Sequence, residues 1–398
     1  MTLTVRELVR PSFTEWRATA IGPTGVSAAA SAAVAYAELA TAMAESGAEA
    51  FQEKVCCASG TRDEVRSARR AALEARSLDA TTPWAYLRGR DDDDGAVCVQ
   101  AWGVARRTDA VALSTVGTGS VRGRLLRSGD LRMLWLGSID GRDAAATLPL
   151  GIRAQTAGMF ESAERALGAA GLTFHDVVRT WIYVSELLAG YRELNAVRTA
   201  FYAARGIGAG SDARPFPAST GIQGRASTEA CVMDLLAIRA GADAARVTPL
   251  DRSDRQGSAF SYGSSFSRAM SVEIEGRQTV LVSGTSSIGP DGATLYPDDP
   301  DRQAVETLLG IASLVEPLGA TLRDVAAGTL FTRDARALEA FERAALTLGV
   351  PELPLARVRA DVCRPDLSLE VEAVVYVPDD IAARGDVARS GTSSGARS

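Results

Sequence analysis

Histidine and lysine are almost missing from this sequence, and their scarcity excludes much enzyme chemistry. His175 and Lys54 are the only residues of their types. A single histidine removes Ser-His-Asp triads, HExxH zinc sites and most metal chemistry from consideration. A single lysine makes a Schiff-base mechanism unpromising. Acid–base catalysis must therefore come from carboxylates, tyrosine or cysteine, and cations that bind a substrate must be arginines.

The cysteines lack the spacing of a metal or redox site. The chain has five, with no CxxC pair and no zinc spacing: Cys56, Cys57, Cys98, Cys231 and Cys363. In a reducing compartment they are expected to be free thiols, and the adjacent Cys56 and Cys57 are interpreted as small buried hydrophobes. Because no Gly-rich phosphate loop follows a strand either, we predict catalysis without a metal or a cofactor.

Long apolar runs and excess positive charge are absent as well. No run approaches the roughly 20 apolar residues that span a bilayer, and the opening MTLTVRELVRPSF has no signal-peptide pattern. The net charge of −6 gives no reason to expect a nucleic-acid partner. With 46% hydrophobic and 23% charged residues among 398, the chain is expected to be globular and cytoplasmic, with no membrane partner.

An internal repeat is the most informative feature that is present. One copy opens with the strand-like run LRMLWLGSIDG (131–141), and the other opens with QTVLVSGTSSIGPDG (278–292). Each run is followed by a segment with apolar residues three and four apart, which predicts a helix. Near-copies with Asp176 and Asp324 at equivalent points come next, then a second helical segment and a closing strand. Each copy is thus predicted to run strand, helix, strand, helix, strand, with room for an added hairpin strand.

This order predicts an α+β fold of two pseudo-symmetric units, each a mixed sheet with helices on one face. The two exposed sheet faces can bury each other, and the junction between the copies is the natural place for a site. We assign 1–240 to an N-terminal extension plus the first unit, 241–380 to the second unit, and 381–398 to a disordered tail. Within 1–130 the signals are weaker and consist of two helical segments and one strand-like run.

Several motifs in the two copies resemble a known fold. They are YRELNAVRTAFY (191–202) and PASTGIQGR (217–225) in the first copy, and SGTSS (283–287) and ADVCRPDLSLEVEA (360–373) in the second. The repeat unit is similar to the Rid (YjgF) fold, which also resembles the small trimeric chorismate mutases. Two degenerate units in one chain, with SFSRA before CRPDL and EVEA, resemble the chorismatase family over roughly residues 85–378.

The resemblance implies a cofactor-independent enzyme that splits the enolpyruvyl ether of chorismate and releases pyruvate. Some members form 3-hydroxybenzoate, a starter unit for secondary metabolites, and others hydrolyse chorismate to a 3,4-dihydroxycyclohexa-1,5-dienoate. Cleavage needs an acid that protonates the terminal methylene carbon, with a pKa near the working pH. A carboxyl group in a partly apolar site has such a pKa. A monomer is the expected state, and a homo-oligomer stays open.

Glu370 is the predicted acid. Strand alternation in LSLEVEAVVYV places Glu370 and Glu372 on one face. From the residues alone, such a pair fits either an acid with a tunable partner or two surface groups that face solvent or pair with arginines. The resemblance places the family's catalytic glutamate on Glu370. Asp234 is expected at the matching place in the first copy, so that one copy keeps the activity while the other serves as scaffold.

The two carboxylates of chorismate need local cations in a chain of net negative charge. In the family pattern a tyrosine and an arginine seven residues later bind substrate, and Tyr191 and Arg198 match this pair. A second pair precedes the second repeat, where Tyr262 and Arg268 match it across a segment that is shorter here than in relatives. Arg214 is a further binding candidate. Each of these residues also fits a surface or structural role.

Cys363 and Ser286 bear on the product. Relatives that form 3-hydroxybenzoate carry cysteine at the place of Cys363, and hydrolytic relatives carry a bulkier aliphatic residue; Cys363 also fits a small buried strand residue. At the place of Ser286 the first group has glycine and the second alanine, so Ser286 matches neither. We predict 3-hydroxybenzoate, with hydrolysis as the alternative. A Rid-type enamine or imine deaminase and a non-catalytic scaffold that binds a metabolite stay open.

Overall fold

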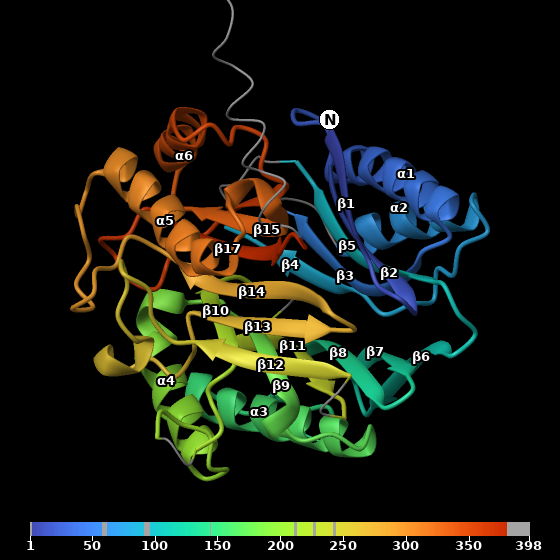
Figure 1. Ribbon diagram of the computed structural model, residues 1–398, viewed down its shortest axis with the longest axis horizontal. Coiled ribbons are helices and arrows are strands. Elements are labelled where there is room, and N and C mark those ends of the chain that lie inside the picture. Colours follow the sequence, from blue (N-terminus) through green and yellow to red (C-terminus); the bar gives the residue numbers. More distant parts are fainter. Residues whose placement is uncertain are drawn as a thin grey trace, which may run out of the picture.

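Three mixed β-sheets, each accompanied by two α-helices, make up the computed structural model of the protein (Figure 1). The structure describes residues 2–57, 62–90, 96–143, 145–210, 213–225, 228–241 and 244–379. The predicted tail, 381–398, lies outside the described residues. We name the three parts by their strands: the N-terminal unit (β1 to β5), the middle unit (β6 to β11) and the C-terminal unit (β12 to β17).

The middle and C-terminal units are the two predicted copies. The middle unit comprises β6 (Val111–Thr118), β7 (Val121–Ser128), β8 (Leu131–Ile139), α3 (Ile152–Ala169), β9 (Val177–Val184), α4 (Leu187–Ala203), β10 (Ala218–Gln223) and β11 (Cys231–Arg239). The C-terminal unit comprises β12 (Ala245–Leu250), β13 (Ala269–Ile274), β14 (Arg277–Thr285), α5 (Pro300–Val315), β15 (Val325–Thr332), α6 (Ala335–Thr347), β16 (Leu355–Arg359) and β17 (Leu369–Tyr376). Their strand orders, β6-β7-β8-β11-β9-β10 and β12-β13-β14-β17-β15-β16, are the same. The predicted α+β class and the order of elements are confirmed.

The N-terminal unit repeats this connectivity, although the sequence showed no third copy. It comprises β1 (Thr2–Val9), β2 (Phe13–Ile21), α1 (Ala28–Ser46), β3 (Glu49–Cys57), α2 (Arg62–Glu74), β4 (Ala85–Arg88) and β5 (Cys98–Arg106). Its strand order, β1-β2-β5-β3-β4, matches β7-β8-β11-β9-β10 of the middle unit. The segment that we expected to be an extension is therefore a further unit of the same design.

Local sequence signals begin the equivalent strands β9 and β15 in the same way. Just before β9, the backbone N–H of Thr173 donates to Oδ2 of Asp176 at 2.7 Å. Just before β15, the N–H of Thr321 donates to Oδ2 of Asp324 at 2.8 Å. Each pair closes a capping box around a short 3-10 turn. The two aspartates that the repeat placed at equivalent points thus have the same structural task.

The inner faces of the three sheets share one hydrophobic core. A single cluster contains buried residues of every unit, among them Phe51, Trp135 and Phe331. Three further clusters each lie within one unit, where its helices pack on its sheet. The helices thus cover the outer faces, and Figure 1 shows the pairs α1–α2, α3–α4 and α5–α6 at separate places around the sheets. Three sheets, where we expected two, bury their faces against one another.

Strand register shows which residues are equivalent in the three units. The pairs β3–β5, β9–β11 and β15–β17 each have one irregularity, which skips Phe51, Val178 and Ala326, respectively. When β5, β11 and β17 are aligned at this irregularity, Gln100, Asp234 and Glu372 occupy equivalent positions. A second set, two residues earlier, is Cys98, Val232 and Glu370. The expected match of Asp234 to Glu370 is therefore wrong, because Asp234 is equivalent to Glu372.

The domain boundary and the membrane expectation concern the whole chain. The predicted boundary between residues 240 and 241 falls in the connection from β11 to β12, and a division into two domains there stays a prediction. Within the described ranges, no α-helix is both long and apolar enough to cross a membrane.

Candidate active site

A cavity of about 770 Å³ lies between the middle and C-terminal units. Helix α4 and strand β10 supply one wall, and the other wall comes from β14, β17 and the segments that precede β13 and β17. Serine hydrogen bonds join the two walls: the N–H of Ser219 donates to Oγ of Ser283 at 2.9 Å, and that hydroxyl donates to the carbonyl of Ser267 at 2.6 Å. The cavity therefore lies at the junction of the two copies.

Most of the predicted site residues line this cavity. They are Tyr191, Arg198, Tyr262, Arg268, Ser286, Cys363 and Glu370. Arg214 does not join them, because it is exposed in the connection that follows α4. Its backbone N–H donates to the carbonyl of Gly206 at 2.9 Å, so this connection folds back on the end of α4. The structure thus brings together residues of both copies and separates Arg214 from them.

Glu370 is buried in the wall formed by β17, with 4% of its surface exposed. Among the described residues its side-chain hydrogen-bond partner is Ser286, whose Oγ lies 3.4 Å from Oε2 and also donates to the carbonyl of Leu369 at 2.9 Å. The carboxyl group can take this position because residue 284 is glycine, since a Cβ there would lie 2.0 Å from Oε1 of Glu370. The SGTSS turn therefore makes room for the carboxyl group and also provides its donor.

The two carboxyl groups on this face of β17 have opposite environments. Burial, and to a smaller extent the charge of Glu372, raises the pKa of Glu370 to about 8. Burial also disfavours ionisation of Glu372, but Lys54 and Arg179, each 2.8 Å away, outweigh it and hold its pKa at about 2. At neutral pH Glu370 therefore keeps its proton beside an ionised neighbour. Pairs of carboxyls with pKa values pushed apart in this way are typical of acid catalysis.

Arg198 and Arg268 bring positive charge to the cavity from opposite walls, and each is 1% exposed. Nη2 of Arg198 donates to Oδ1 of Asn195 at 2.5 Å, and its Nη1 lies 3.4 Å from Oγ of Ser219. Nε of Arg268 donates to the carbonyl of Gly257 at 2.9 Å. Within the described part of the chain neither guanidinium has a carboxylate partner, and Nε of Arg198 and Nη2 of Arg268 donate no hydrogen bond. Buried guanidinium groups in this state are expected to bind anions.

Aromatic rings support these arginines. The centroid of the Phe266 ring is 6.0 Å from Cζ of Arg198 and 5.6 Å from Cζ of Arg268. The Tyr262 ring is 5.4 Å from Cζ of both Arg268 and Arg364. Such contacts stabilise cations and fix the planes of their guanidinium groups. Sequence analysis missed Phe266 and Arg364, although both lie inside motifs that it used, SFSRA and CRPDL.

Cys363 and Tyr191 line the cavity as groups that keep their protons. Burial, followed by the charge of Glu370, raises the pKa of Cys363 to about 12. Burial likewise raises the pKa of Tyr191 to about 12. All five cysteines lie in the described part of the chain, and none forms a disulfide. At neutral pH Cys363 is a thiol, so any effect on a reaction would come from its size and not from nucleophilic attack.

The arrangement as a whole suits a doubly anionic molecule that needs a proton. Two arginines can bind carboxylates, and a protonated carboxyl group lies in the same cavity. In the described ranges no three His, Cys, Asp or Glu side chains come close enough together to hold a metal ion. Catalysis without a metal or a cofactor stays a prediction.

Comparisons with known proteins show the fold. No protein-family model and no curated protein sequence matches the chain. Among solved structures it is similar to a chorismatase, with 19% identity and a TM-score of 0.57 over 82% of this chain and 93% of that one. It also matches a YjgF/YER057c/UK114 family member from Mycobacterium tuberculosis, with 27% identity and a TM-score of 0.27 over 33% of this chain and 100% of the other. A further match, over 33% of this chain and 100% of the other, is RidA from an Antarctic Psychrobacter, with 20% identity and a TM-score of 0.28. The predicted likeness to the chorismatase fold is confirmed.

Proposed function

We propose that the chain cleaves the enolpyruvyl ether of chorismate to pyruvate and 3-hydroxybenzoate. The observation that carries the proposal is the cavity in which a protonated, buried Glu370 accompanies Arg198 and Arg268, both without a carboxylate partner in the described structure. Chorismate has two carboxylates and a vinyl ether whose cleavage begins with a proton, so the cavity meets both demands of the substrate. The fold shared with a chorismatase supports the proposal.

Proton transfer starts the proposed reaction. Glu370 gives its proton to the terminal methylene carbon, the electron pair of the C=C bond forms the new C–H bond, and the ether carbon becomes part of an oxocarbenium ion. Glu370 is then a carboxylate whose charge stabilises that cation. Arg198 and Arg268 hold the two substrate carboxylates through charge-assisted hydrogen bonds, which places the methylene carbon near the acid.

The oxocarbenium ion can be trapped in two ways. Addition of water gives a hemiketal that collapses to pyruvate and the dihydroxycyclohexadienoate, with one water consumed. Trapping by the C4 hydroxyl of the ring forms a cyclic ketal and releases the proton of that hydroxyl. The ring C4–O bond and the bond from the ketal carbon to the C3 oxygen then break, so pyruvate leaves with the C4 oxygen. Carbon C3 loses a proton, the C3 oxygen gains one, and 3-hydroxybenzoate forms with no water consumed. In both cases a proton is released, and its return to the carboxylate of Glu370 restores the acid.

The small side chain of Cys363 in the cavity supports the second route. A short thiol leaves room for the ring hydroxyl to reach the cation, whereas a branched side chain would push the ring away. Cys363→Val should therefore shift the product towards the dihydroxycyclohexadienoate while pyruvate release continues. An unchanged product ratio would leave Cys363 as a packing residue and make hydrolysis the better assignment.

One incubation tests the proposal. The purified protein is mixed with chorismate, pyruvate is followed by lactate dehydrogenase and NADH, and the ring product is identified by mass spectrometry. We expect equal amounts of pyruvate and 3-hydroxybenzoate, also after exhaustive treatment with EDTA. A loss that a specific metal restores would refute metal-free catalysis. Absence of pyruvate would refute the proposal and leave an enamine or imine deaminase, detected by ammonia release, or a metabolite-binding scaffold.

The use of the product, the oligomeric state and the cellular location are further parts of the proposal. We propose that the 3-hydroxybenzoate is a starter unit for a secondary metabolite and that a monomer makes it in the cytoplasm. Native mass spectrometry in the presence of chorismate measures the oligomeric state, and cell fractionation measures the location.

A further inference from the structure

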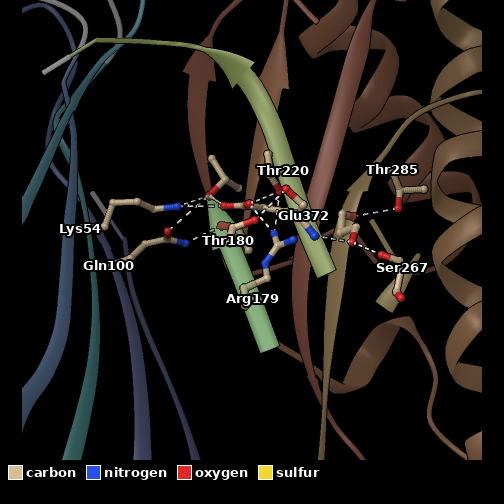
Figure 2. A network of polar contacts seen from close by, with 12 residues as sticks. Lys54, Gln100, Arg179, Thr180, Thr220, Ser267, Thr285 and Glu372 are labelled. Carbon is tan, nitrogen blue, oxygen red and sulfur yellow. Dashed lines mark hydrogen bonds and ion pairs between the residues drawn. The ribbon is translucent and has the colours of Figure 1, made fainter. Parts of the chain in front are cut away.

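Glu372, two residues beyond the proposed acid, lies in a buried cluster of charges (Figure 2). Its Oε1 accepts hydrogen bonds from Nζ of Lys54 and Oγ1 of Thr329, each at 2.8 Å. Its Oε2 accepts hydrogen bonds from Nη2 of Arg179 at 2.8 Å and Oγ1 of Thr220 at 2.6 Å. These donors, two of them cationic, hold the carboxylate ionised and in one orientation.

The donors come from all three units. Lys54 on β3 belongs to the N-terminal unit, Arg179 on β9 and Thr220 on β10 belong to the middle unit, and Thr329 lies on β15 of the C-terminal unit. Each is at most 5% exposed. A small cavity of about 40 Å³ beside them is also lined from all three units. The cluster therefore lies where the three sheets meet.

This cluster reaches Glu370 through Glu372. The two side chains share one face of β17, about 7 Å apart along the strand. The charged or titratable groups that act on Glu370 or feel its charge are Glu372 on its own strand, Arg179 on β9, Arg268 before β13, Tyr191 on α4 and Cys363 before β17. Among these groups Glu372 is the anion, and it opposes a second negative charge on Glu370.

The N-terminal unit contacts the strand that bears Glu370 through this cluster. None of the described residues that line the large cavity comes from residues 2–106. Lys54 nevertheless binds the carboxylate that faces the acid, and in the other units the equivalent position is Trp181 or Thr329. A lysine at this one position thus connects the N-terminal unit to the chemistry of a site formed by the other two.

We propose that Glu372 is a positioning residue that keeps the proton on Glu370, and that Lys54 makes the N-terminal unit part of the active site by holding Glu372 ionised. The inference rests on the proposed function, in which Glu370 is the acid. The competing explanation is a cluster that only joins the three sheets, since buried ion pairs are found in that role as well.

Opposite changes in the pKa of Glu370 separate the two explanations. Glu372→Gln removes the anion and leaves both cations, so the pKa of Glu370 should fall by about one pH unit or more. Lys54→Met removes a cation while Arg179 still holds Glu372 ionised, so the pKa of Glu370 should rise. Both substitutions break the same ion pair. A cluster that only joins the sheets would give similar losses of stability and no opposite movement.

The pKa is measured by NMR titration of protein labelled with ¹³C at the glutamate carboxyl carbons, and Glu370→Gln identifies the signal. Thr220→Val is the matched control, because it removes a hydrogen bond to Glu372 but no charge and should move the pKa of Glu370 least. If Glu372→Gln does not fold, Lys54→Met/Glu372→Gln replaces it and should show a lower pKa for Glu370 than Lys54→Met alone. An unchanged pKa on loss of the Glu372 charge, or equal changes in the same direction for both substitutions, would overturn the inference.

The titration needs no substrate, so it fails or succeeds independently of the proposed function. An enzyme that cleaves chorismate but whose Glu370 pKa ignores Glu372 and Lys54 retains the function and loses this inference. A protein that leaves chorismate intact but shows the opposite pKa changes loses the function and keeps the coupling. In an active enzyme the upper limb of the pH profile of kcat/KM should move with the same variants.

Discussion

The junction between the middle and C-terminal units differs from the one between the C-terminal and N-terminal units, although the strands that meet there are connected alike. At the first junction β17 presents Glu370, and α4 presents Tyr191 and Arg198. At the second junction, β5 has Cys98 at the register of Glu370. Helix α6 has Glu339 and Leu346 at the same distances from its N-cap as Tyr191 and Arg198 have in α4. A repeated backbone thus provides similar junctions, while a few side chains give the first one a buried arginine and a protonated carboxyl group.

The equivalent positions at the centre of the molecule also differ. Gln100 is neutral, and Glu372 is held ionised by four donors. Asp234 has fewer donors than Glu372: the N–H of Ser138 donates to its Oδ1 at 2.6 Å, and its Oδ2 has no partner among the described residues. Burial raises the pKa of Asp234 to about 6. Of the two carboxyl groups in this set, Glu372 with two cationic donors is therefore ionised, whereas Asp234 with a single backbone donor has a raised pKa.

The largest effect is expected when Glu370 is made as inert as its equivalents. Glu370→Gln cannot donate the proton, so kcat for pyruvate release should fall by about a hundred- to ten-thousand-fold. The fold should persist, because glutamine has the same shape and still accepts a hydrogen bond from Ser286. Cys98→Ala, at the equivalent place in β5, is the control and should keep the wild-type kcat. Pyruvate release at the normal rate by Glu370→Gln would move the acid to another residue.

Loss of either arginine should weaken the binding of anions that the cavity at the first junction is expected to provide. Arg198→Ala and Arg268→Ala each leave a substrate carboxylate buried without its cation, so KM for chorismate should rise by about two to three orders of magnitude. Steady-state kinetics measures this change. Arg357→Ala is the control, since Arg357 pairs with Glu342 at 2.9 Å, its side chain is 52% exposed, and such surface pairs contribute little. Wild-type KM in both site variants would place the substrate elsewhere.

A smaller effect is expected from the glycine that makes room for the acid. In Gly284→Ala the new Cβ would lie 2.0 Å from Oε1 of Glu370, so the carboxyl group must turn away and kcat should fall about ten- to a hundredfold. Gly168→Ala in α3 is the control, because a Cβ there meets nothing within 4 Å. If kcat of Gly284→Ala equals that of the control, the carboxyl group of Glu370 can move aside without loss of activity, and its position beside residue 284 is not needed for the reaction.

The smallest effect concerns stability at the centre. Asp234 binds its proton more tightly in the folded chain than in the unfolded chain, so its ionisation weakens the fold as the pH rises from about 4 to 6. Asp234→Asn avoids this cost and should raise the free energy of unfolding by on the order of 2–3 kcal/mol above pH 6, with little difference below pH 4. Denaturant titrations at pH 4 and pH 7.5 test this. A variant that is less stable at pH 7.5 would show that the charge of Asp234 supports Lys54.

Short-range patterns in the sequence were enough to predict the helices and strands of the two repeats and most residues of the candidate site. Apolar spacing predicted α3, α4, α5 and α6, and strand alternation put Glu370 and Glu372 on one face of β17, because both depend only on neighbouring residues. Motif resemblance then found the cavity residues on α4, β17 and the SGTSS turn. Arg214 lies outside the cavity, because its place depends on how a loop folds back on the end of α4.

The third unit and the charge of each carboxyl group were beyond such patterns. The N-terminal unit shares connectivity with the others but not their motifs, since β5 has Cys98 and Gln100 where β17 has two glutamates. Sequence analysis treated Lys54 as unpromising, yet it lies 2.8 Å from Glu372 across a separation of 318 residues. Identical side chains at Glu370 and Glu372 receive opposite protonation states because burial and the donors around each one come from strands that meet only when the sheets pack together.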